Sequence, residues 1–141
     1  MSLTLQQANR IIETALAHGA SLQAAPLCVA VLDAGGHLLA LQRQEASSNL
    51  RPQIATAKAA GTLALGLPSR KIAEIAQANP AVIAALASLS SGGIVPSPGG
   101  VIVIDGSGVV VGAVGVTGDT PDNDEACAIA GVTRAGLAIR E

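Results

Sequence analysis

The chain has 141 residues and a mass of 13.8 kDa, the size of one domain, and half of its residues are hydrophobic although none is Phe, Tyr or Trp. This composition excludes an intrinsically disordered chain, which needs low hydrophobicity and a high net charge. A nucleic-acid-binding protein is also excluded, because the net charge is −2 and there are no aromatic rings on which bases could stack.

The N-terminal part of the chain predicts a helix followed by a β-hairpin. Thr4 and Gln7 form a capping-box sequence, and apolar residues then recur at three- and four-residue spacing until about Gly19. Two apolar segments, 27–32 and 37–42, surround an Asp-Ala-Gly-Gly turn sequence, which is the pattern of a hairpin.

The middle of the chain predicts three helices and a long loop. Helical spacing runs over 51–65 until a Gly-Leu-Pro sequence breaks it. Ser69 is placed to cap a second helix, and an Asn-Pro sequence begins a third over about 79–86. The Ser-, Gly- and Pro-rich segment 88–100 is expected to be a loop, and loops of this length inside a domain often have a function.

The C-terminal part predicts a second hairpin and a last helix. The β-branched runs 101–104 and 109–116 surround an Asp-Gly-Ser-Gly turn and are apolar enough to be buried on both faces of a sheet. Acidic residues favour the start of the last helix, expected over about 121–138. The order αββαααββα predicts one domain over 1–141 of the α+β class, with a mainly antiparallel sheet layered by helices.

The sequence also bears on membrane insertion, cellular compartment and oligomeric state. Residues 75–104 carry no charge, yet we expect no membrane-spanning helix there, because Asn, Pro, Gly and Ser interrupt the apolar sequence. The N-terminus has no signal-peptide pattern, and Cys28 and Cys127 suit free thiols, so a cytoplasmic protein is expected. With 13% charged residues the surface is thinly covered by charge, which favours a homo-oligomer.

Two polar segments could bind a ligand. The loop 92–100 has paired glycines whose amides could face a carboxylate or a phosphate; a purely structural connection is the alternative. In the segment 117–127, Asp119, Asp122 and Asn123 could bind a metal or transfer protons; capping of the last helix is the alternative. The acidic segment lacks the later spacing and the closing Glu of an EF-hand loop, and Cys28 and Cys127 lack metal-ligand spacing, so no metal site is assigned.

Five single residues could also carry chemistry. Lys58, on a helix of small residues, could form a Schiff base or pair with a carboxylate, or it could lie in solvent. Arg51 could clamp an anion. Cys127, near a helix N-terminus, is either a ligand-binding thiol or a small packing residue. His18 and His37 are each either structural residues or ligands.

Four stretches of the chain together carry a resemblance to a known family. They are VAVLDAGGHLLALQR (29–43), IATAKAAGTLAL (54–65), GGIVPSPGGVIVIDGSGVVVGAVGVTGD (92–119) and DEACAIAG (124–131). In this order they resemble the small haem-binding GlcG/HbpS family, which is itself similar to the C-terminal domain of PduO-type corrinoid proteins. The resemblance extends over nearly all of residues 3–138.

The resemblance implies a profilin-like α/β sandwich, with a mainly antiparallel sheet of about five strands flanked by helices, and a homo-oligomer built from dimers. It also implies that the protein binds haem or a corrinoid, and some members of the family are associated with haem degradation. His18 and His37 are then the candidates for an axial haem ligand. The other candidate ligand-binding residues are Arg51, Gly99, Gly100, Thr117, Asp119, Asp124 and Cys127.

Three functions are open at this point. The first is a small-ligand-binding protein for haem or a related tetrapyrrole. The second is an enzyme acting on an oxo- or hydroxy-acid, in which Lys58 or Asp122 moves a proton and Arg51 holds the substrate carboxylate. The third is a non-catalytic, oligomeric accessory protein.

Overall fold

The computed structural model describes residues 2–141, which form five helices and five strands. In chain order these are α1 (Leu5–Ser21), β1 (Cys28–Asp33), β2 (Leu38–Arg43), α2 (Arg51–Leu65), α3 (Ser69–Ala78), α4 (Pro80–Leu89), β3 (Gly100–Ile104), β4 (Val110–Thr117), α5 (Pro121–Arg134) and β5 (Ala138–Arg140). The strands form one antiparallel sheet in the order β2-β1-β4-β3-β5.

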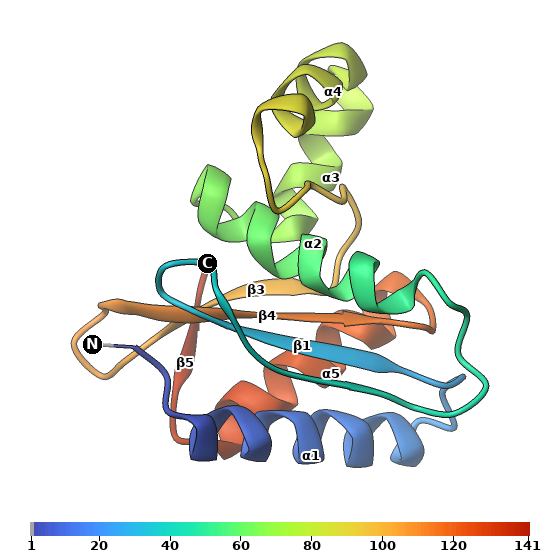
Figure 1. The fold of residues 1–141 in the computed structure, drawn as a ribbon, viewed down its shortest axis with the longest axis vertical. Helices are drawn as coiled ribbons and strands as arrows, with labels where there is room; N and C mark the ends of the chain where they lie inside the picture. The colour runs from blue at the N-terminus through green and yellow to red at the C-terminus, as the bar shows by residue number, and fades with distance from the viewer. Residues whose placement is uncertain (1) are drawn as a thin grey trace.

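Helices cover both faces of this sheet (Figure 1). α2 packs on β1, β4 and β3 on one face, while α1 and α5 pack against each other on the opposite face. β1 and β4 lie at the centre and are almost entirely buried, as their continuous apolar sequences predict. The α+β class and the five-stranded antiparallel sheet are therefore confirmed.

The two sides of the sheet are packed differently. On the α1 and α5 side, branched aliphatic residues fill the core, among them Ile12 of α1 and Val132 of α5. On the α2 side the contacts are made by small residues such as Ala55 and Ala59. A Cβ at Gly115 of β4 would collide with the carbonyl oxygen of Ala55, so the backbones of α2 and β4 approach closely because this glycine has no side chain.

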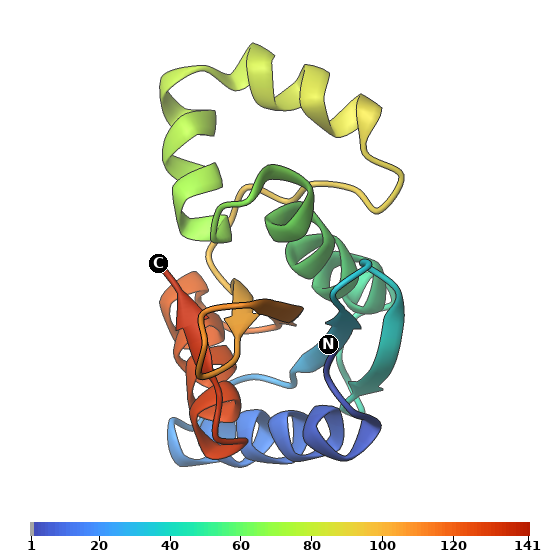
Figure 2. The ribbon, with the colours of Figure 1, turned by 90° about the vertical axis from the view of Figure 1, so that its left-hand side faces the viewer.

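α3 and α4 form an arm that projects from the sheet on the α2 side (Figures 1 and 2). α4 packs on α3, and the segment 90–99 leads the chain back to β3. Ile83 is the buried side chain of α4, whereas the exposed fractions of Val82 and Leu89 are 42% and 82%. Within residues 2–141, no helix is both long and apolar enough to cross a membrane.

The end of the chain differs from the sequence prediction. The last helix was expected to continue to about residue 138, but α5 ends at Arg134 and residues 138–140 form β5. The helix stops because Gly136 has φ 78°, a conformation that glycine adopts without strain. The chain then turns back and pairs with β3, so the order of elements gains a fifth strand.

The predicted helix cap at Ser69 is also wrong. Pro68 is the N-cap residue of α3, and it provides no side-chain cap. The hydroxyl of Ser69 instead accepts the backbone N–H of Gly100 at 2.7 Å and donates to the Gly100 carbonyl oxygen at 3.3 Å. Because β5 pairs with β3 only from Ile102 onward, this hydroxyl replaces a neighbouring strand at the start of β3.

Candidate functional site

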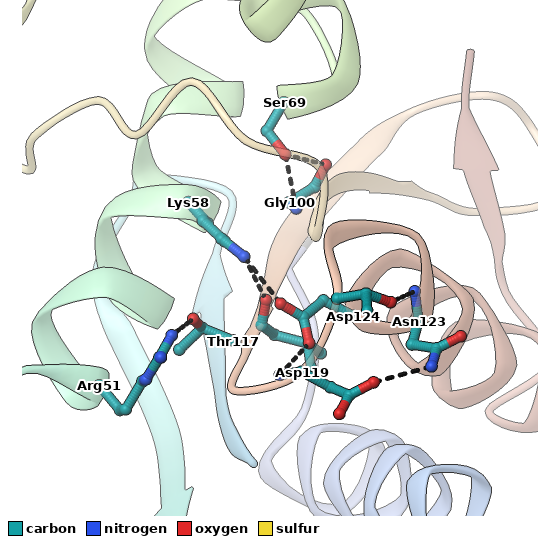
Figure 3. Close-up of polar contacts among 10 residues, drawn as sticks. Arg51, Lys58, Ser69, Gly100, Thr117, Asp119, Asn123 and Asp124 are labelled. Carbon is teal, nitrogen blue, oxygen red and sulfur yellow. Dashed lines mark hydrogen bonds and ion pairs between the residues drawn. The ribbon is translucent and has the colours of Figure 1, made fainter. Parts of the chain in front are cut away.

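A buried ion pair joins α2 to α5 next to the end of β4 (Figure 3). Lys58 Nζ lies 3.1 Å from Asp124 Oδ2 and donates to the carbonyl oxygen of Val116 at 2.9 Å. The side chains of Lys58 and Asp124 are each 3% exposed. Two residues that the sequence had singled out separately therefore meet in one buried contact.

The connection between β4 and α5 holds Asp124 in place. Its Oδ1 accepts the backbone N–H of Asp119 at 2.9 Å, and the Asp119 carboxylate accepts the Ala25 N–H and the Asn123 side-chain amide. The hydrogen bond from Ala25 lowers the pKa of Asp119 most, and the bond from Asn123 lowers it further. Thr120 caps α5 by accepting the Asn123 N–H, so the capping function expected of this segment is performed by a threonine.

Gly99 and Gly100 let the start of β3 pass beside Lys58. A Cβ at Gly99 would lie 2.9 Å from Lys58 Nζ, and one at Gly100 would collide with the Lys58 carbonyl oxygen. Gly99 also has φ 128°, which favours glycine. Since the Gly100 amide is occupied by Ser69, this pair of glycines serves close packing here and does not present a free amide at Gly100 to a ligand.

The electrostatics of the pair are set by burial. Burial lowers the pKa of Lys58, because the ammonium group loses its hydration, and the Asp124 carboxylate opposes this change. Arg51 adds a smaller lowering of the Lys58 pKa, and its Nη1 donates to Thr117 Oγ1 at 2.7 Å. With a 3% exposed side chain, Lys58 ties α2, β4 and α5 together through its bonds to Val116 and Asp124.

Asp122 and Cys127 lie apart from this pair. The Asp122 side chain is 82% exposed, and its Oδ1 lies 2.6 Å from Arg70 Nη2. Arg70 also donates through Nε to both carboxylate oxygens of Glu125 at 3.1 Å. Cys127 is fully buried in the core between α1, α5 and the sheet.

We expect neither cysteine to react with an aromatic disulfide reagent at neutral pH while the protein is folded. Burial raises the pKa of the Cys28 thiol and of the Cys127 thiol to about 11, so the reactive thiolate is scarce, and both side chains are inaccessible. Absorbance of the released thiol should report no reaction in buffer and reaction of both cysteines in denaturant. Rapid modification of Cys127 in the folded protein would contradict this prediction and support a ligand-binding thiol.

The two histidines that are candidates for haem ligation have different surroundings. His18 is half-buried in the last turn of α1, and its carbonyl oxygen accepts the Ser21 hydroxyl. His37 follows the turn between β1 and β2, and its side chain is 81% exposed. Asp33 Oδ1 accepts the backbone N–H groups of Gly35 and His37, each at 2.9 Å, and lies 3.3 Å from His37 Nδ1.

This turn makes Asp33 a fixed partner of the His37 imidazole. The backbone N–H of His37 lowers the pKa of Asp33, so the carboxylate is ionised at neutral pH. A carboxylate at Nδ1 leaves Nε2 as the nitrogen that can bind a metal ion, which is the usual arrangement of metal-ligating histidines.

Three adjoining hollows lie along the outer side of α2 and share Ser91. Their volumes are about 370, 420 and 300 Å³, and their lining side chains are all uncharged. Together we call them the α2 trough, lined by residues of the turn 34–36, of β2, of α2 and of the segment 86–94. His37 lies between Gly36 and Leu38, which line two of these hollows.

Sequence reasoning missed both Asp33 and the α2 trough. A signal for Asp33 was present, because an aspartate at the start of a Gly-Gly turn commonly accepts the N–H groups that follow it. For the trough the signal was partial: the loop 88–100 was expected to have a function, and its residues 89–92 and 94 line the trough. The other walls come from segments far apart in the chain. Within residues 2–141, no group of three or more His, Cys, Asp or Glu side chains could hold a metal ion.

The fold and these sites define a small α+β domain in which an antiparallel sheet lies between two helical layers. The sequence model described as "haem degrading protein HbpS-like" matches residues 3–133, and the chain therefore belongs to the HbpS-like family. This confirms the resemblance carried by the four sequence stretches. A comparison with curated protein sequences gave no match.

Solved structures share this fold at low sequence identity. The PduOC:heme complex is similar with a TM-score of 0.88 and 19% identity, covering 100% of both chains. The Klebsiella pneumoniae protein ORFY has a TM-score of 0.85 and 24% identity, covering 95% of this chain and 90% of its own. HbpS has a TM-score of 0.80 and 24% identity, and the match covers 94% of this chain and 89% of the HbpS chain.

Proposed function

We propose that this protein binds haem in the α2 trough, with His37 as an axial ligand of the iron. The observation that carries the proposal is the placement of His37, whose Nδ1 faces the Asp33 carboxylate and whose neighbours in the chain line the trough. Membership of the HbpS-like family supports the same ligand, and so does the shared fold with the PduOC:heme complex.

The residues present fit a haem group. A porphyrin needs an axial donor and apolar walls. Leu38, Leu41 and Leu63 line the trough, and His37 directly precedes Leu38 in the chain. The imidazole of His37 would hold the haem, which would supply an iron centre. Asp33 would orient that imidazole and raise its basicity. A corrinoid also presents a large ring, so cobalamin belongs in the same titration as a second ligand.

The acid/base alternative receives less support from the same geometry. Lys58 is buried and bonded to Asp124 and Val116, and Asp122 is an exposed partner of Arg70. Neither residue lines the α2 trough. We therefore assign ligand binding to the trough and a structural function to the Lys58–Asp124 pair.

We also propose that copies of the chain associate. The exposed apolar side chains of α4, Val82 and Leu89, support this proposal, as does the low fraction of charged residues. The native mass of the purified protein, recorded with the haem titrations below, tests it.

Replacing His37 with alanine should weaken haem binding about 100-fold, because the iron loses its axial ligand. Titration of the purified protein with haem, followed by the Soret band, measures the affinity and the spectrum of the ligated iron. The wild-type protein should give a shifted Soret band, and His37→Ala should not.

Two further variants test whether His37 binds the iron or only supports the fold. His18→Ala should retain wild-type affinity, since His18 lies in α1 away from the trough. Asp33→Asn keeps an oxygen for the turn N–H groups but removes the charge beside Nδ1, and it should weaken binding about tenfold. Loss of binding in His18→Ala alone would reject His37 as the ligand, and a wild-type protein without any Soret shift would reject haem binding.

A further inference from the structure

Another cavity, with no lining residue in common with the α2 trough, lies between the first turn of α3, α5 and β5. Its volume is about 300 Å³, and we call it the α3–β5 cavity. Its apolar part is formed by Val101, Ile129 and Ile139, and Val101 is 1% exposed. The charged lining residues are Arg70, Lys71, Glu125, Arg140 and Glu141.

Arg70 and Glu125 neutralise each other within this lining. Arg70 Nε donates to both carboxylate oxygens of Glu125, and Nη2 donates to Asp122. The two acidic partners raise the pKa of Arg70, so it stays charged and held in position. The group has one positive and two negative charges, so Arg70 is fully engaged and offers no free cation to an anionic ligand.

Lys71 and Arg140 are not neutralised in this way. Arg140 Nη2 contacts the carbonyl oxygen of Gly66 at 3.4 Å, and a carbonyl does not cancel the charge of a guanidinium. Lys71 Nζ lies 3.6 Å from Glu74, but both side chains are more than half exposed, and such surface pairs are weak. The α3–β5 cavity therefore combines an apolar wall with two cations, Lys71 and Arg140, and a further carboxylate, Glu141, lines the same cavity. Neither cation is in a buried ion pair, so each can bind the carboxylate of a ligand.

We propose that the α3–β5 cavity binds a short aliphatic carboxylate. The hydrocarbon tail packs against Val101, Ile129 and Ile139, and the carboxylate is bound by Arg140 and Lys71. A guanidinium suits this ligand, because its planar donors match the two oxygens of a carboxylate. This site is independent of haem binding, which involves other residues.

The ligand class is tested by nuclear magnetic resonance titration of the isotope-labelled full chain with butyrate, pentanoate and hexanoate. Signals of residues that line the α3–β5 cavity should shift in a saturable way, and affinity should rise about fourfold with each added methylene. Hexanamide, which has the same tail without the charge, should bind at least about tenfold more weakly. Hexanoate without saturable shifts at these residues, or hexanamide binding equally well, would overturn the proposal.

Charge variants test the assigned cations. Lys71→Gln with Arg140→Gln should weaken hexanoate binding about tenfold or more, whereas Arg134→Gln, an exposed change in the last turn of α5, should leave it unchanged. Glu141→Gln removes a negative charge from the lining and should leave affinity unchanged or raise it. If Glu141→Gln weakens binding, or the double variant does not, the cavity does not select a carboxylate through these cations.

Discussion

Replacing Lys58 with methionine should lower the free energy of unfolding by about 3–5 kcal/mol. Methionine keeps much of the length of the side chain but leaves the Asp124 carboxylate buried without its cation, and the Val116 carbonyl loses a donor. Removing one partner of a buried pair is costly because the remaining charge has lost its hydration and gains nothing in return. Equilibrium denaturation followed by circular dichroism measures the change.

A second substitution separates the ion pair from the loss of lysine packing. In Lys58→Met with Asp124→Asn, the buried charge is absent while an oxygen still accepts the Asp119 N–H. This double variant should recover about 1–3 kcal/mol relative to Lys58→Met, which is the coupling of the two residues. A double variant less stable than the single one would show that the pair is not the main contribution of Lys58.

Replacing Gly115 with alanine should destabilise the protein by about 3 kcal/mol, because the new methyl group would collide with the Ala55 carbonyl oxygen of α2. This contact is between a side chain and backbone, so it is relieved only if α2 moves away from β4. Such a shift would also disturb Lys58, which reaches the end of β4 from the same helix. Chemical denaturation measures the loss of stability.

Gly106 provides a matched control for this substitution. It lies in the turn between β3 and β4, a Cβ there meets nothing within 4 Å, and its φ is not among the positive ones. Gly106→Ala should therefore change the free energy of unfolding by less than about 0.5 kcal/mol. Equal effects of the two substitutions would show that the close approach of α2 to β4 does not limit stability.

The helices and strands that could be predicted are those with sequence signals within a few residues. The Thr4 and Gln7 side chains form the capping box of α1, and the β-branched runs form β3 and β4. The exceptions depended on contacts between distant segments. β5 is three residues long and exists through its pairing with β3, and Ser69 bonds to Gly100, which is 31 residues away.

In the candidate sites, too, single residues could be predicted from the sequence, whereas most of their contacts could not. Lys58, Asp119 and Asp124 stood out as polar residues in apolar or turn sequences, but the pairing of Lys58 with Asp124 joins residues 66 positions apart. For His37 the partner was local, since Asp33 is four residues away in the same turn. Only the loop wall of the α2 trough was indicated by the sequence. The hollow itself depends on how the turn, α2 and α4 are placed in space.

The sequence by itself determined a small α+β protein whose core is built without aromatic rings, because hydrophobic periodicity and turn residues act over a few positions. Only the tertiary structure decided that Lys58 is buried with Asp124, and that uncharged hollows are lined by Gly36 and Leu38, the neighbours of His37 in the chain. The physical reason is that burial depends on which surfaces meet. The alanine- and glycine-rich contact of α2 with β4 lets the two backbones approach closely enough to enclose a charge.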